Sequence, residues 1–413
     1  MRTAPPPSVL SPAASRLALV GLSVLAAWVP AFAQDALPAV TTGLDVLVEA
    51  GFEPLRGKKV GLITNHTGRT RSGTGIVEAF LNQDACRLRV LFSPEHGFAG
   101  LLDQSKIEDA KHSSGLEIKS LYGETRKPTR EMLEGLDTLV FDIQDIGCRF
   151  YTYVSTMKLA MEAATEHGLD FVVLDRPNPI GGEIFAGPIL ESGDESFIAA
   201  HTIPLQHGMT VGELARMLHD ELGLKGSLSV IECAGWQRSM RWDETGLVWV
   251  NPSPNMRNLN QALLYPGIGL VEFTNVSVGR GTDTPFEILG APYMDGRALA
   301  ALLRGRNLPG VTFIPVEFVP NASKFEDELC RGVQILITDR DALDAIRTGM
   351  TLAWALRRLY PDAWEIERFA RLLAEPAAFE NIRDGAFAEQ AIATWLGELE
   401  AFGARRARYL LYR

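Results

Sequence analysis

The first half of the chain repeats one pattern of hydrophobic and polar positions. A short apolar run ends in a polar turn that contains Gly or Pro, and a segment with helical spacing follows. The pattern occurs four times, with apolar runs at residues 59–63, 88–92, 138–141 and 171–174. Short strands that alternate with helices are typical of βαβ units, so the pattern predicts an α/β fold built on a parallel sheet.

Three helices can be placed from their boundary signals. Residues 157–167 have helical spacing between the third and fourth apolar runs. The segment Thr210–Glu213 has the sequence of a capping box, whose first and last side chains cap each other's backbone N–H groups, and it predicts a helix over 214–222. A long amphipathic pattern over 341–360 ends at Pro361, which cannot continue a helix.

The sequence changes in character near residue 250. A turn-rich stretch, Asn251–Asn255, contains two prolines. Apolar runs that predict three further strands follow at 270–273, 311–316 and 333–337. We therefore expect two domains, 34–258 and 259–413, of which the second is a smaller α/β domain.

The first 33 residues have the three parts of a secretory signal peptide. Arg2 and Arg16 are the only charged residues, 17–29 is an apolar run, and Ala31–Ala33 offers a small-x-small cleavage site. An uncleaved anchor is the alternative, but the run is short for a bilayer, which needs about 20 residues. We expect cleavage after Ala33 and an exported protein, periplasmic or secreted, without a membrane span.

Composition narrows the classes of function. The chain has 413 residues, 46% of them hydrophobic, and a formal net charge of −11. This is a globular balance, and an acidic chain is a poor basis for nucleic-acid binding, which needs a basic face. Export also disfavours chemistry that depends on NAD or ATP. The four cysteines, Cys86, Cys148, Cys233 and Cys330, could form disulfides in an oxidising compartment or stay as buried thiols.

Polar side chains gather in the turns that follow the four predicted strands. In an open parallel sheet, ligands bind outside the carboxyl ends of the strands, so these turns should face one site. The candidate residues in the turns are Asn65, His66, Glu95, His96, Asp142, Gln144, Asp145, Asp175, Arg176 and Asn178. We interpret them as a functional site, because the loops at the other end of the sheet show no such density of polar groups.

Carboxylates, amides and two histidines suit hydrolysis or recognition of a polyhydroxylated ligand. Gly73–Gly75 does not complete a dinucleotide fingerprint, and the sequence has no Walker motif and no G-x-S-x-G elbow. Glycoside hydrolysis needs one protonated carboxyl group and usually a second, ionised one. Glu95 lies in a partly apolar turn, which suits a general acid, and Asp142 and Asp145 complete the predicted catalytic set. The alternative for Glu95 is a carboxylate that fixes its loop by accepting backbone N–H bonds.

Further candidates lie outside the four turns. Arg149 and Tyr151 follow the third strand and suit a carboxylate and a sugar face. The alternative for Arg149 is a structural ion pair with Asp142 or Asp145. The remaining substrate-binding candidates are His207, Glu272, Asn275 and Arg280. We expect no metal, because lone loop histidines usually serve as hydrogen-bonding groups. The alternative metal ligands are His66, His96, His201 and His207 with Asp142.

Four segments carry long motifs, at 91–98 (Leu-Phe-Ser-Pro-Glu-His-Gly-Phe), 141–153, 174–179 and 275–282. Through them the chain, from about residue 44 to its end, resembles the NamZ family of exo-β-N-acetylmuramidases. The resemblance implies a Rossmann-like N-terminal domain, a smaller α/β C-terminal domain, a site in the cleft between them and no cofactor. It also implies removal of terminal N-acetylmuramic acid from the non-reducing end of peptidoglycan, with Glu95 as the leading catalytic residue.

The sequence departs from the family pattern at one position. Many members carry an acidic residue just before the Gly-Pro matched by Gly187–Pro188, where this chain has Ala186. If a carboxylate is essential there, Glu183, Glu191 or Asp145 has to replace it. Alternatively, the N-acetyl group of the substrate could itself attack the anomeric carbon, and the enzyme would then need no nucleophile of its own.

The lactyl carboxylate of N-acetylmuramic acid needs a local cation in so acidic a chain, and the candidates are Arg149, Arg176 and Arg280. Two other classes of function stay open from the sequence. One is a non-catalytic periplasmic binder of cell-wall fragments, and the other is a metal-dependent amidase or deacetylase that uses the histidines. The sequence does not give the stereochemical outcome, the preferred chain length or the oligomeric state.

Overall fold

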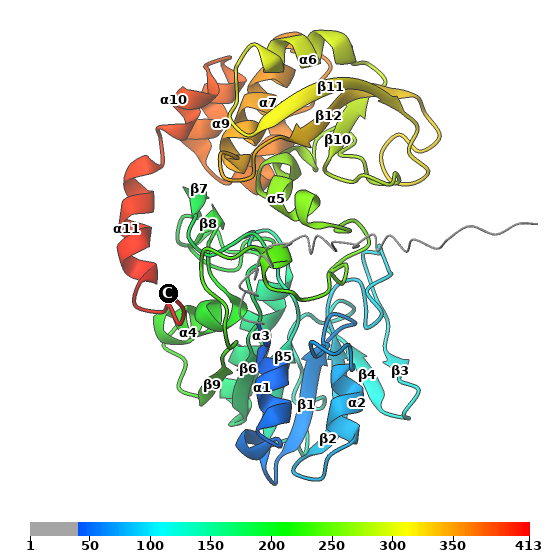
Figure 1. Ribbon diagram of the computed structural model, residues 1–413, viewed down its shortest axis with the longest axis vertical. Coiled ribbons are helices and arrows are strands. Elements are labelled where there is room, and N and C mark those ends of the chain that lie inside the picture. Colours follow the sequence, from blue (N-terminus) through cyan, green and yellow to red (C-terminus); the bar gives the residue numbers. More distant parts are fainter. Residues whose placement is uncertain (1–39) are drawn as a thin grey trace, which may run out of the picture. The chain divides into compact units, whose positions relative to one another are not determined.

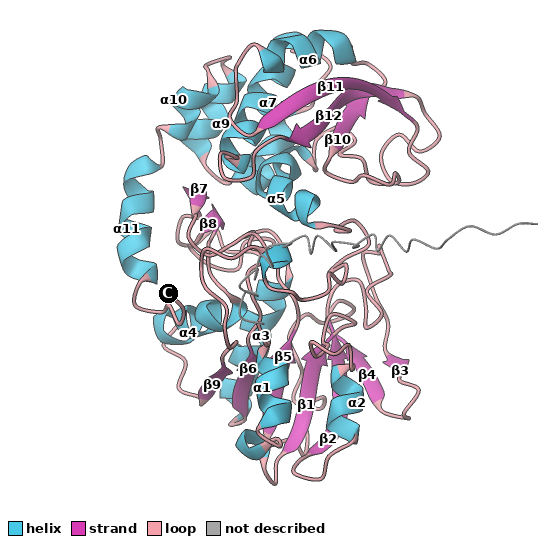
Figure 2. Cartoon of the chain, in the orientation of Figure 1, coloured by secondary structure: helices cyan, strands magenta, loops and turns pink. Residues whose placement is uncertain are grey.

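The computed structural model describes residues 40–413, so the predicted signal peptide and its cleavage site lie outside the described residues. These residues form one compact unit. Within the described part, a seven-stranded, a three-stranded and a two-stranded sheet are surrounded by helices (Figures 1 and 2). The α/β class is confirmed.

The seven-stranded sheet forms the centre of the N-terminal half. Its strand order is β3-β4-β2-β1-β5-β6-β9, and all neighbouring pairs are parallel except β3 and β4. The bounds are β1 Lys59–Thr64, β2 Arg87–Ser93, β3 Ala110–Lys111, β4 Glu117–Ser120, β5 Thr138–Asp142, β6 Asp170–Leu174 and β9 Leu228–Ile231. The four strands predicted from the repeated pattern are β1, β2, β5 and β6, and all four are confirmed.

Different helices cover the two faces of this sheet. They are α1 Gly43–Glu49 and α2 Ile76–Leu81 on one face, and α3 Tyr153–His167 and α4 Val211–Glu221 on the other. Successive side chains of a strand point to opposite faces. In β5, Val140 packs with the first pair of helices, whereas Leu139 and Phe141 pack with the second. The predicted strands are apolar throughout because both faces of the sheet are buried.

The helix signals were reliable where a side chain caps the backbone. At the start of α4, the Glu213 N–H donates to Thr210 Oγ1 at 3.2 Å and the Thr210 N–H donates to Glu213 Oε2 at 3.0 Å, so the capping box is confirmed. Helix α3 begins at Tyr153, four residues before the predicted start. Its N-cap residue, Thr152, makes no capping hydrogen bond, so the sequence carries no start signal there.

The C-terminal half contains a smaller antiparallel sheet in the order β10-β12-β11. The bounds are β10 Ile288–Ala291, β11 Val311–Phe318, β12 Cys330–Ile337, α5 Leu259–Ile268, α6 Gly296–Arg304, α7 Ala345–Leu359, α8 Ala370–Leu373, α9 Pro376–Arg383 and α10 Ala388–Ile392. Strands at 311–316 and 333–337 are confirmed. The helix predicted over 341–360 starts at Ala345, because Asp344 caps it by accepting the Arg347 N–H at 2.8 Å.

The strand predicted at 270–273 is wrong. Residues Gly269–Val271 form the 3₁₀ helix η3, which directly continues α5. Leu270 and Val271 are fully buried. A short helical segment buried on all sides has the same apolar run as a buried strand, so the run alone does not distinguish them. Three other 3₁₀ helices are η1 Glu53–Leu55, η2 Trp242–Glu244 and η4 Ile366–Phe369.

The end of the chain returns to the N-terminal half. Helix α11 (Leu396–Arg406) packs against β7 (Ala186–Ile189), which pairs with β8 (Pro204–Gln206) in the two-stranded sheet. Beyond α11, the Tyr412 hydroxyl donates to the Asp175 carboxylate at 2.6 Å. The chain thus crosses between its halves twice, and the expected domain division after residue 258 stays a prediction.

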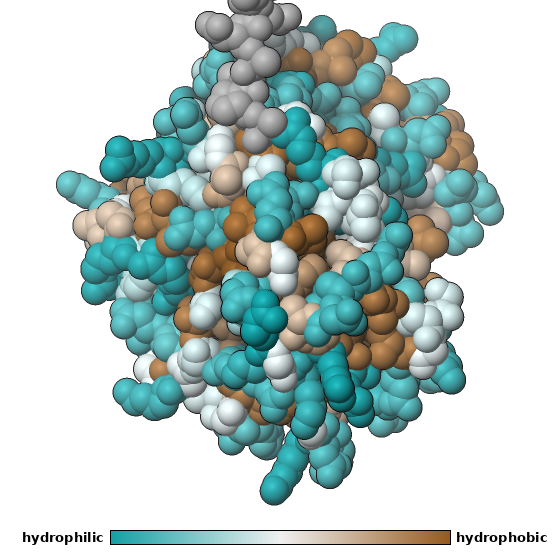
Figure 3. All heavy atoms as spheres, turned by 60° about the horizontal axis from the view of Figure 1, so that its bottom comes forward, coloured by the Kyte–Doolittle hydropathy of each residue, from teal (hydrophilic) through white to brown (hydrophobic). Residues whose placement is uncertain are grey.

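Hydrophilic residues cover most of the face in Figure 3, and hydrophobic residues lie in patches between them. Between residues 40 and 413, no helix combines the length and the apolar character that membrane crossing requires. All four cysteines are buried and unpaired, so none of the possible disulfides is formed. Burial raises the pKa of each thiol.

Candidate active site

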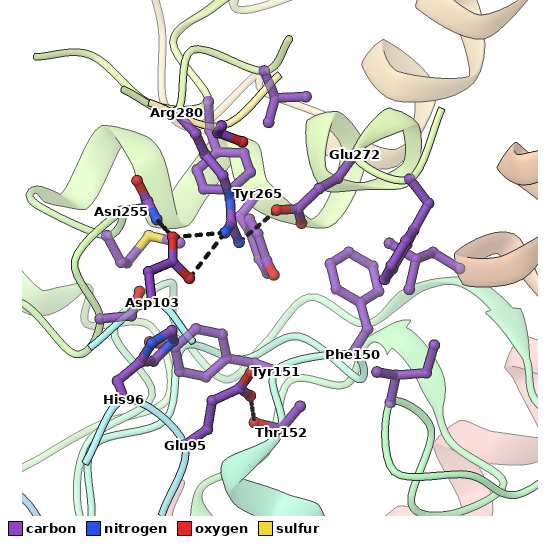
Figure 4. Close-up of a pocket in the computed structure, with 18 of the residues that line it drawn as sticks. Glu95, His96, Asp103, Phe150, Tyr151, Thr152, Asn255, Tyr265, Glu272 and Arg280 are labelled. Carbon is purple, nitrogen blue, oxygen red and sulfur yellow. Dashed lines mark hydrogen bonds and ion pairs between the residues drawn. The ribbon is translucent and has the colours of Figure 1, made fainter. Parts of the chain in front are cut away.

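A cavity of about 340 Å³ lies between loops at the carboxyl edge of the large sheet and loops of the C-terminal half (Figure 4). We call it the main cavity. Its polar lining includes Glu95, His96, Asp103, Thr152, Asn255, Glu272, Arg280 and Lys324. Its volume is in the range of small-molecule sites.

Glu95 reaches the main cavity from a tight turn after β2. The next two residues, His96 (φ 68°) and Gly97 (φ 74°), are left-handed, and His96 Nδ1 lies 2.8 Å from the Leu102 carbonyl oxygen. The Thr152 hydroxyl donates to Glu95 Oε2. No backbone N–H of residues 40–413 donates to this carboxylate, so Glu95 does not fix its loop in the way that the alternative interpretation required.

A second hydroxyl group also faces Glu95. Burial raises the pKa of Tyr122 to about 12, and the nearby Glu95 carboxylate adds to the shift. Hydroxyl groups can donate to a carboxylate and accept from a carboxylic acid. The Thr152 hydroxyl, which donates to Glu95 in this structure, can therefore act as a donor or as an acceptor.

Arg280 lies across the main cavity from Glu95, between two carboxylates (Figure 4). Its guanidinium is 2.5 Å from Glu272 and 3.2 Å from Asp103, which also accepts from Asn255 Nδ2 at 3.1 Å. Burial disfavours the charged form of Arg280, but Glu272 and Asp103 have the larger effect and raise its pKa. The group is therefore a permanent cation inside a cavity that also holds two anions.

Glycines on both sides make this position of Arg280 possible. Gly279 and Gly281 have φ values of 81° and 80°. A Cβ on Gly281 would lie 2.4 Å from the carbonyl oxygen of Ala322, so no larger residue fits there.

Aromatic rings form one wall of the main cavity. Tyr151 and Tyr153 meet edge to face at 5.0 Å, and Tyr265 meets Phe286 edge to face at 4.6 Å. The Tyr151 hydroxyl is buried and has no hydrogen-bond partner among the described residues. An apolar wall with one unsatisfied hydroxyl suits a sugar ring, which has both an apolar face and hydroxyl groups.

Lys324 is a second cation of the main cavity. Its ammonium group donates to the Glu272 carbonyl oxygen. Burial lowers the pKa of Lys324, and the nearby charge of Arg280 lowers it further. The Glu272 carboxylate acts in the opposite direction. The C-terminal half thus supplies both cations of the cavity.

Five residues of the predicted site line the main cavity: Glu95, His96, Tyr151, Glu272 and Arg280. The predicted catalytic residues Asp142 and Asp145 do not line it. Asp142 is fully buried in an ion pair with Arg176, whose Nη2 lies 2.9 Å from Asp142 Oδ2. Burial raises the pKa of Asp142, and the Arg176 charge opposes this shift. The pair neutralises two charges at the sheet edge instead of facing the cavity.

Asp145 and His207 hold a loop. Asp145 Oδ2 accepts the Gly147 N–H at 2.7 Å and lies 3.3 Å from His207 Nε2. His207 is fully buried, and its Nδ1 accepts the Met209 N–H at 3.2 Å. Neither side chain reaches the main cavity in this geometry.

Arg149 also lies outside the main cavity, and it makes neither of the two predicted kinds of interaction. Its Nη1 and Nη2 groups donate to four backbone carbonyls, those of Pro188, Ile203, Leu372 and Leu373, at 2.9–3.2 Å. Burial lowers the pKa of Arg149 to about 10. The side chain ties the two halves of the protein together through backbone groups, which a sequence pattern does not reveal.

Asp175 anchors the end of the chain. Its carboxylate accepts from the hydroxyls of Thr210 and Tyr412 and from the Gly212 N–H, at 2.6–2.8 Å. Burial raises the pKa of Asp175 to about 6, and these hydrogen bonds oppose the shift. Its role in this geometry is structural.

The other predicted residues outside the main cavity are Asn65, His66, Gln144, Asn178 and Asn275. Asn275 shows their common role: its side chain donates to the Ala363 carbonyl at 2.7 Å and accepts the Glu365 N–H at 2.8 Å. Polar residues at strand ends are needed to satisfy loop backbone groups as well as ligands. Ala186, Glu183 and Glu191 are likewise absent from the lining of the main cavity among the described residues.

Sequence reasoning missed most of the lining, including Asp103, Thr152, Asn255, Tyr265 and Lys324. Asn255 ends the turn-rich stretch Asn251–Asn255, so that stretch is a usable signal. Tyr265 lies on a mostly apolar, largely buried helix, and Asp103 and Lys324 lie in loops without a motif. Within residues 40–413, no group of three or more His, Cys, Asp or Glu side chains is arranged to hold a metal ion.

Comparisons with known proteins point to one family. The model described as exo-beta-N-acetylmuramidase NamZ, N-terminal, matches residues 60–260, and its C-terminal counterpart matches 263–412. The peptidoglycan beta-N-acetylmuramidase NamZ of Bacillus subtilis (strain 168) is 42% identical over 382 residues, which cover 91% of this chain and 92% of that protein.

Two crystal structures of DUF1343 family proteins from Bacteroides fragilis NCTC 9343 have the same fold. One has a TM-score of 0.84 at 38% identity, and the other a TM-score of 0.74 at 30% identity. In both cases the match covers 91% of this chain and 99% of the other. The likeness therefore extends over both halves of the described structure.

Proposed function

This chain belongs to the exo-β-N-acetylmuramidase NamZ family, and we propose that it releases terminal N-acetylmuramic acid from the non-reducing end of peptidoglycan chains or fragments. One observation carries the proposal. Glu95, which accepts a hydrogen bond from the Thr152 hydroxyl, faces the Arg280 guanidinium across a cavity with an aromatic wall. This arrangement offers an acid for the glycosidic oxygen, a charge for a carboxylate and a surface for the sugar ring.

Glu95 acts as the general acid in this proposal. It transfers its proton to the glycosidic oxygen as the bond from that oxygen to the anomeric carbon breaks, and water supplies the hydroxyl group that replaces the leaving sugar. Asp103 and Glu272 are the other carboxylates of the main cavity, and both are paired with Arg280. This pairing supports the choice of Glu95 as the acid.

Arg280 reads the lactyl carboxylate. Of the three arginines that the sequence offers for this role, Arg149 and Arg176 are committed elsewhere, and only Arg280 lines the main cavity. Guanidinium groups bind carboxylates in a forked geometry. The lactyl ether is what distinguishes muramic acid from glucosamine, so this contact would select the substrate.

Export is part of the proposal. The basic residues, the apolar run and the small-x-small site within residues 1–33 support a signal peptide cleaved after Ala33. A periplasmic or secreted enzyme would meet its wall substrate directly.

Hydrolysis by purified residues 34–413 tests the proposal. We expect release from a chromogenic β-N-acetylmuraminide but not from the glucosaminide analogue. Glu95→Gln should lower kcat about 1,000-fold, because the amide cannot donate the proton. Glu108→Gln, which alters an exposed carboxylate of the neighbouring loop, serves as the matched control and should keep full activity. Binding of intact muropeptides without release of sugar would favour the non-catalytic binder instead.

A further inference from the structure

A second cavity, of about 300 Å³, opens at the carboxyl edge of the large sheet. Among the described residues it shares no lining side chain with the main cavity. Thr67 and Gln144, which line it, belong to the loops after β1 and β5. The chain order reverses between these strands, since β2 lies on one side of β1 and β5 on the other. Open α/β sheets bind ligands at such a reversal.

Arginines dominate the polar lining of the second cavity. Arg176 is paired with Asp142, but no carboxylate of the described residues lies within ion-pair distance of Arg69 or Arg71. Asp142, Asp45 and Asp175 are buried acids near Arg176, and none of them forms an ion pair with Arg69 or Arg71. Among residues 40–413, these two guanidinium groups therefore have no ion-pair partner, in a chain of net charge −11. The second cavity is therefore suited to an anionic group.

Backbone carbonyls hold the two unpaired arginines in place. Arg69 Nη1 donates to the Gly73 carbonyl at 3.1 Å, and Arg71 Nη1 donates to the Val40 carbonyl at 3.2 Å. Each guanidinium keeps its other terminal nitrogen for a ligand. Anchored guanidinium groups lose little conformational entropy when an anion binds.

Two buried polar atoms on residues that line the second cavity have no partner among residues 40–413. Gln144 is 4% exposed; its Nε2 donates to the carbonyls of Asp145 and Pro177, but its Oε1 accepts no hydrogen bond. Trp242 Nε1 is buried and donates none. Such atoms are rare in native proteins. A ligand that supplies both a donor and an acceptor would satisfy them.

The rest of the second cavity is apolar. Leu247, Val248 and Val250 line it, and Val248 is 75% exposed. An exposed valine beside two arginines offers apolar surface to a ligand that also carries a charge. A bare inorganic anion would leave this surface unused.

We propose that the second cavity binds a short peptide with a free carboxylate group. The carboxylate pairs with Arg69 and Arg71, a peptide N–H donates to Gln144, a peptide carbonyl accepts from Trp242, and an apolar side chain packs on Val248. Peptides carry all of these groups within a few ångströms of one another. This binding is separate from the hydrolysis proposed for the main cavity and does not depend on it.

Calorimetric titration of residues 34–413 with N-acetyl-alanyl-alanine tests the proposal. The peptide amide, which lacks the carboxylate, and inorganic phosphate, which lacks the peptide groups, are the matched probes. The free acid should bind at least about tenfold more tightly than either one, and added salt should weaken it. Equal affinity for the amide, equal affinity for phosphate or no binding of the acid would overturn the proposal.

A pair of variants at one exposed position locates the binding site without disturbing the fold. Val248→Asp places a negative charge at the rim and should weaken binding of the acid about tenfold, whereas the neutral Val248→Asn should change it less than about threefold. Equal effects of the two variants would show that the peptide binds elsewhere. Muraminide hydrolysis, followed in parallel, should be unchanged in both, so the two proposals fail independently.

Discussion

Two arginines, Arg176 and Arg280, form ion pairs with carboxylates in different settings within this one protein. Arg176 and its single partner Asp142 have side chains that are 4% and 0% exposed, and their charges cancel. The Arg280 side chain is 27% exposed and has two carboxylate partners, of which Asp103 is 48% exposed. The first pair is closed to solvent and holds the sheet edge. The second is open, and it has one carboxylate that a substrate carboxylate could replace.

The comparison teaches that burial separates structural from functional ion pairs more clearly than residue type does. Removing one partner of a closed pair leaves an uncompensated buried charge, which is costly. Removing one partner of an open pair lets water take its place. Variants of the closed pair, Arg176 and Asp142, should therefore lower the stability of the fold. Variants of the open pair at Arg280 should instead impair substrate selection.

The largest effect should come from Asp142→Asn. Arg176 would keep its charge in a buried site, and the free energy of unfolding should fall by about 3–5 kcal/mol. Urea unfolding followed by circular dichroism measures it. A loss below about 1 kcal/mol would mean that the closed pair behaves like a surface pair, and the comparison would break down.

Asp175→Asn tests a buried carboxyl group without a cation. Its pKa rises from 3.8 to about 6 on folding, so the folded state binds the proton more tightly. The protonated carboxyl therefore contributes fully to the free energy of unfolding below pH 4. This contribution, about 3 kcal/mol, is lost as the pH rises to about 6. Urea unfolding between pH 4 and 7 should show this decline in the parent protein and a weaker one in the variant. Parallel curves would contradict the prediction.

Arg280→Gln should damage substrate selection rather than folding. A lost hydrogen bond to a charged group is worth about 1.5–3 kcal/mol, so kcat/KM for the muraminide should fall about 10- to 100-fold. Any weak turnover of the glucosaminide should change less than about threefold. Arg89→Gln, at an exposed arginine of β2, is the matched control. Equal losses on both sugars would refute the assignment of Arg280 to the lactyl group.

The smallest effect should come from Asp103→Asn. It removes a half-exposed carboxylate that competes for Arg280, so KM for the muraminide should fall about threefold while the free energy of unfolding changes by less than about 1 kcal/mol. Initial rates over a range of substrate concentrations measure the first, and urea unfolding the second. A raised KM would show that Asp103 helps the substrate instead of competing with it.

The fold was largely predictable because apolar runs buried on both faces of a sheet are distinctive. The runs that became β1, β2, β5 and β6 could hardly form anything else between helical segments. The run at 270–273 misled because a helix buried on all sides has the same composition. Helix α3 began early for a related reason, since no capping side chain marks its start.

The site was predictable only in part, for a different physical reason. Strand ends identify where polar residues gather, and Glu95 was found in this way. Which of those residues faces a cavity depends on pairing across the fold, and Asp142 and Arg176 pair with each other over 34 positions. Asp103 reaches Arg280 across 177 positions. Contacts of that range leave no local pattern.

The fastening of the chain's end has a consequence for how the protein is made. The Tyr412 hydroxyl satisfies Asp175 and accepts the Cys233 N–H at 2.9 Å, and the Leu411 N–H donates to Glu213 at 2.9 Å. The first half of the protein therefore lacks part of its own interior until residues 409–413 have left the ribosome. A nascent chain would stay incompletely folded during synthesis, which is the state that a secretion channel for extended polypeptides accepts. Clipping those last five residues afterwards would reopen the interior of the half that was synthesised first.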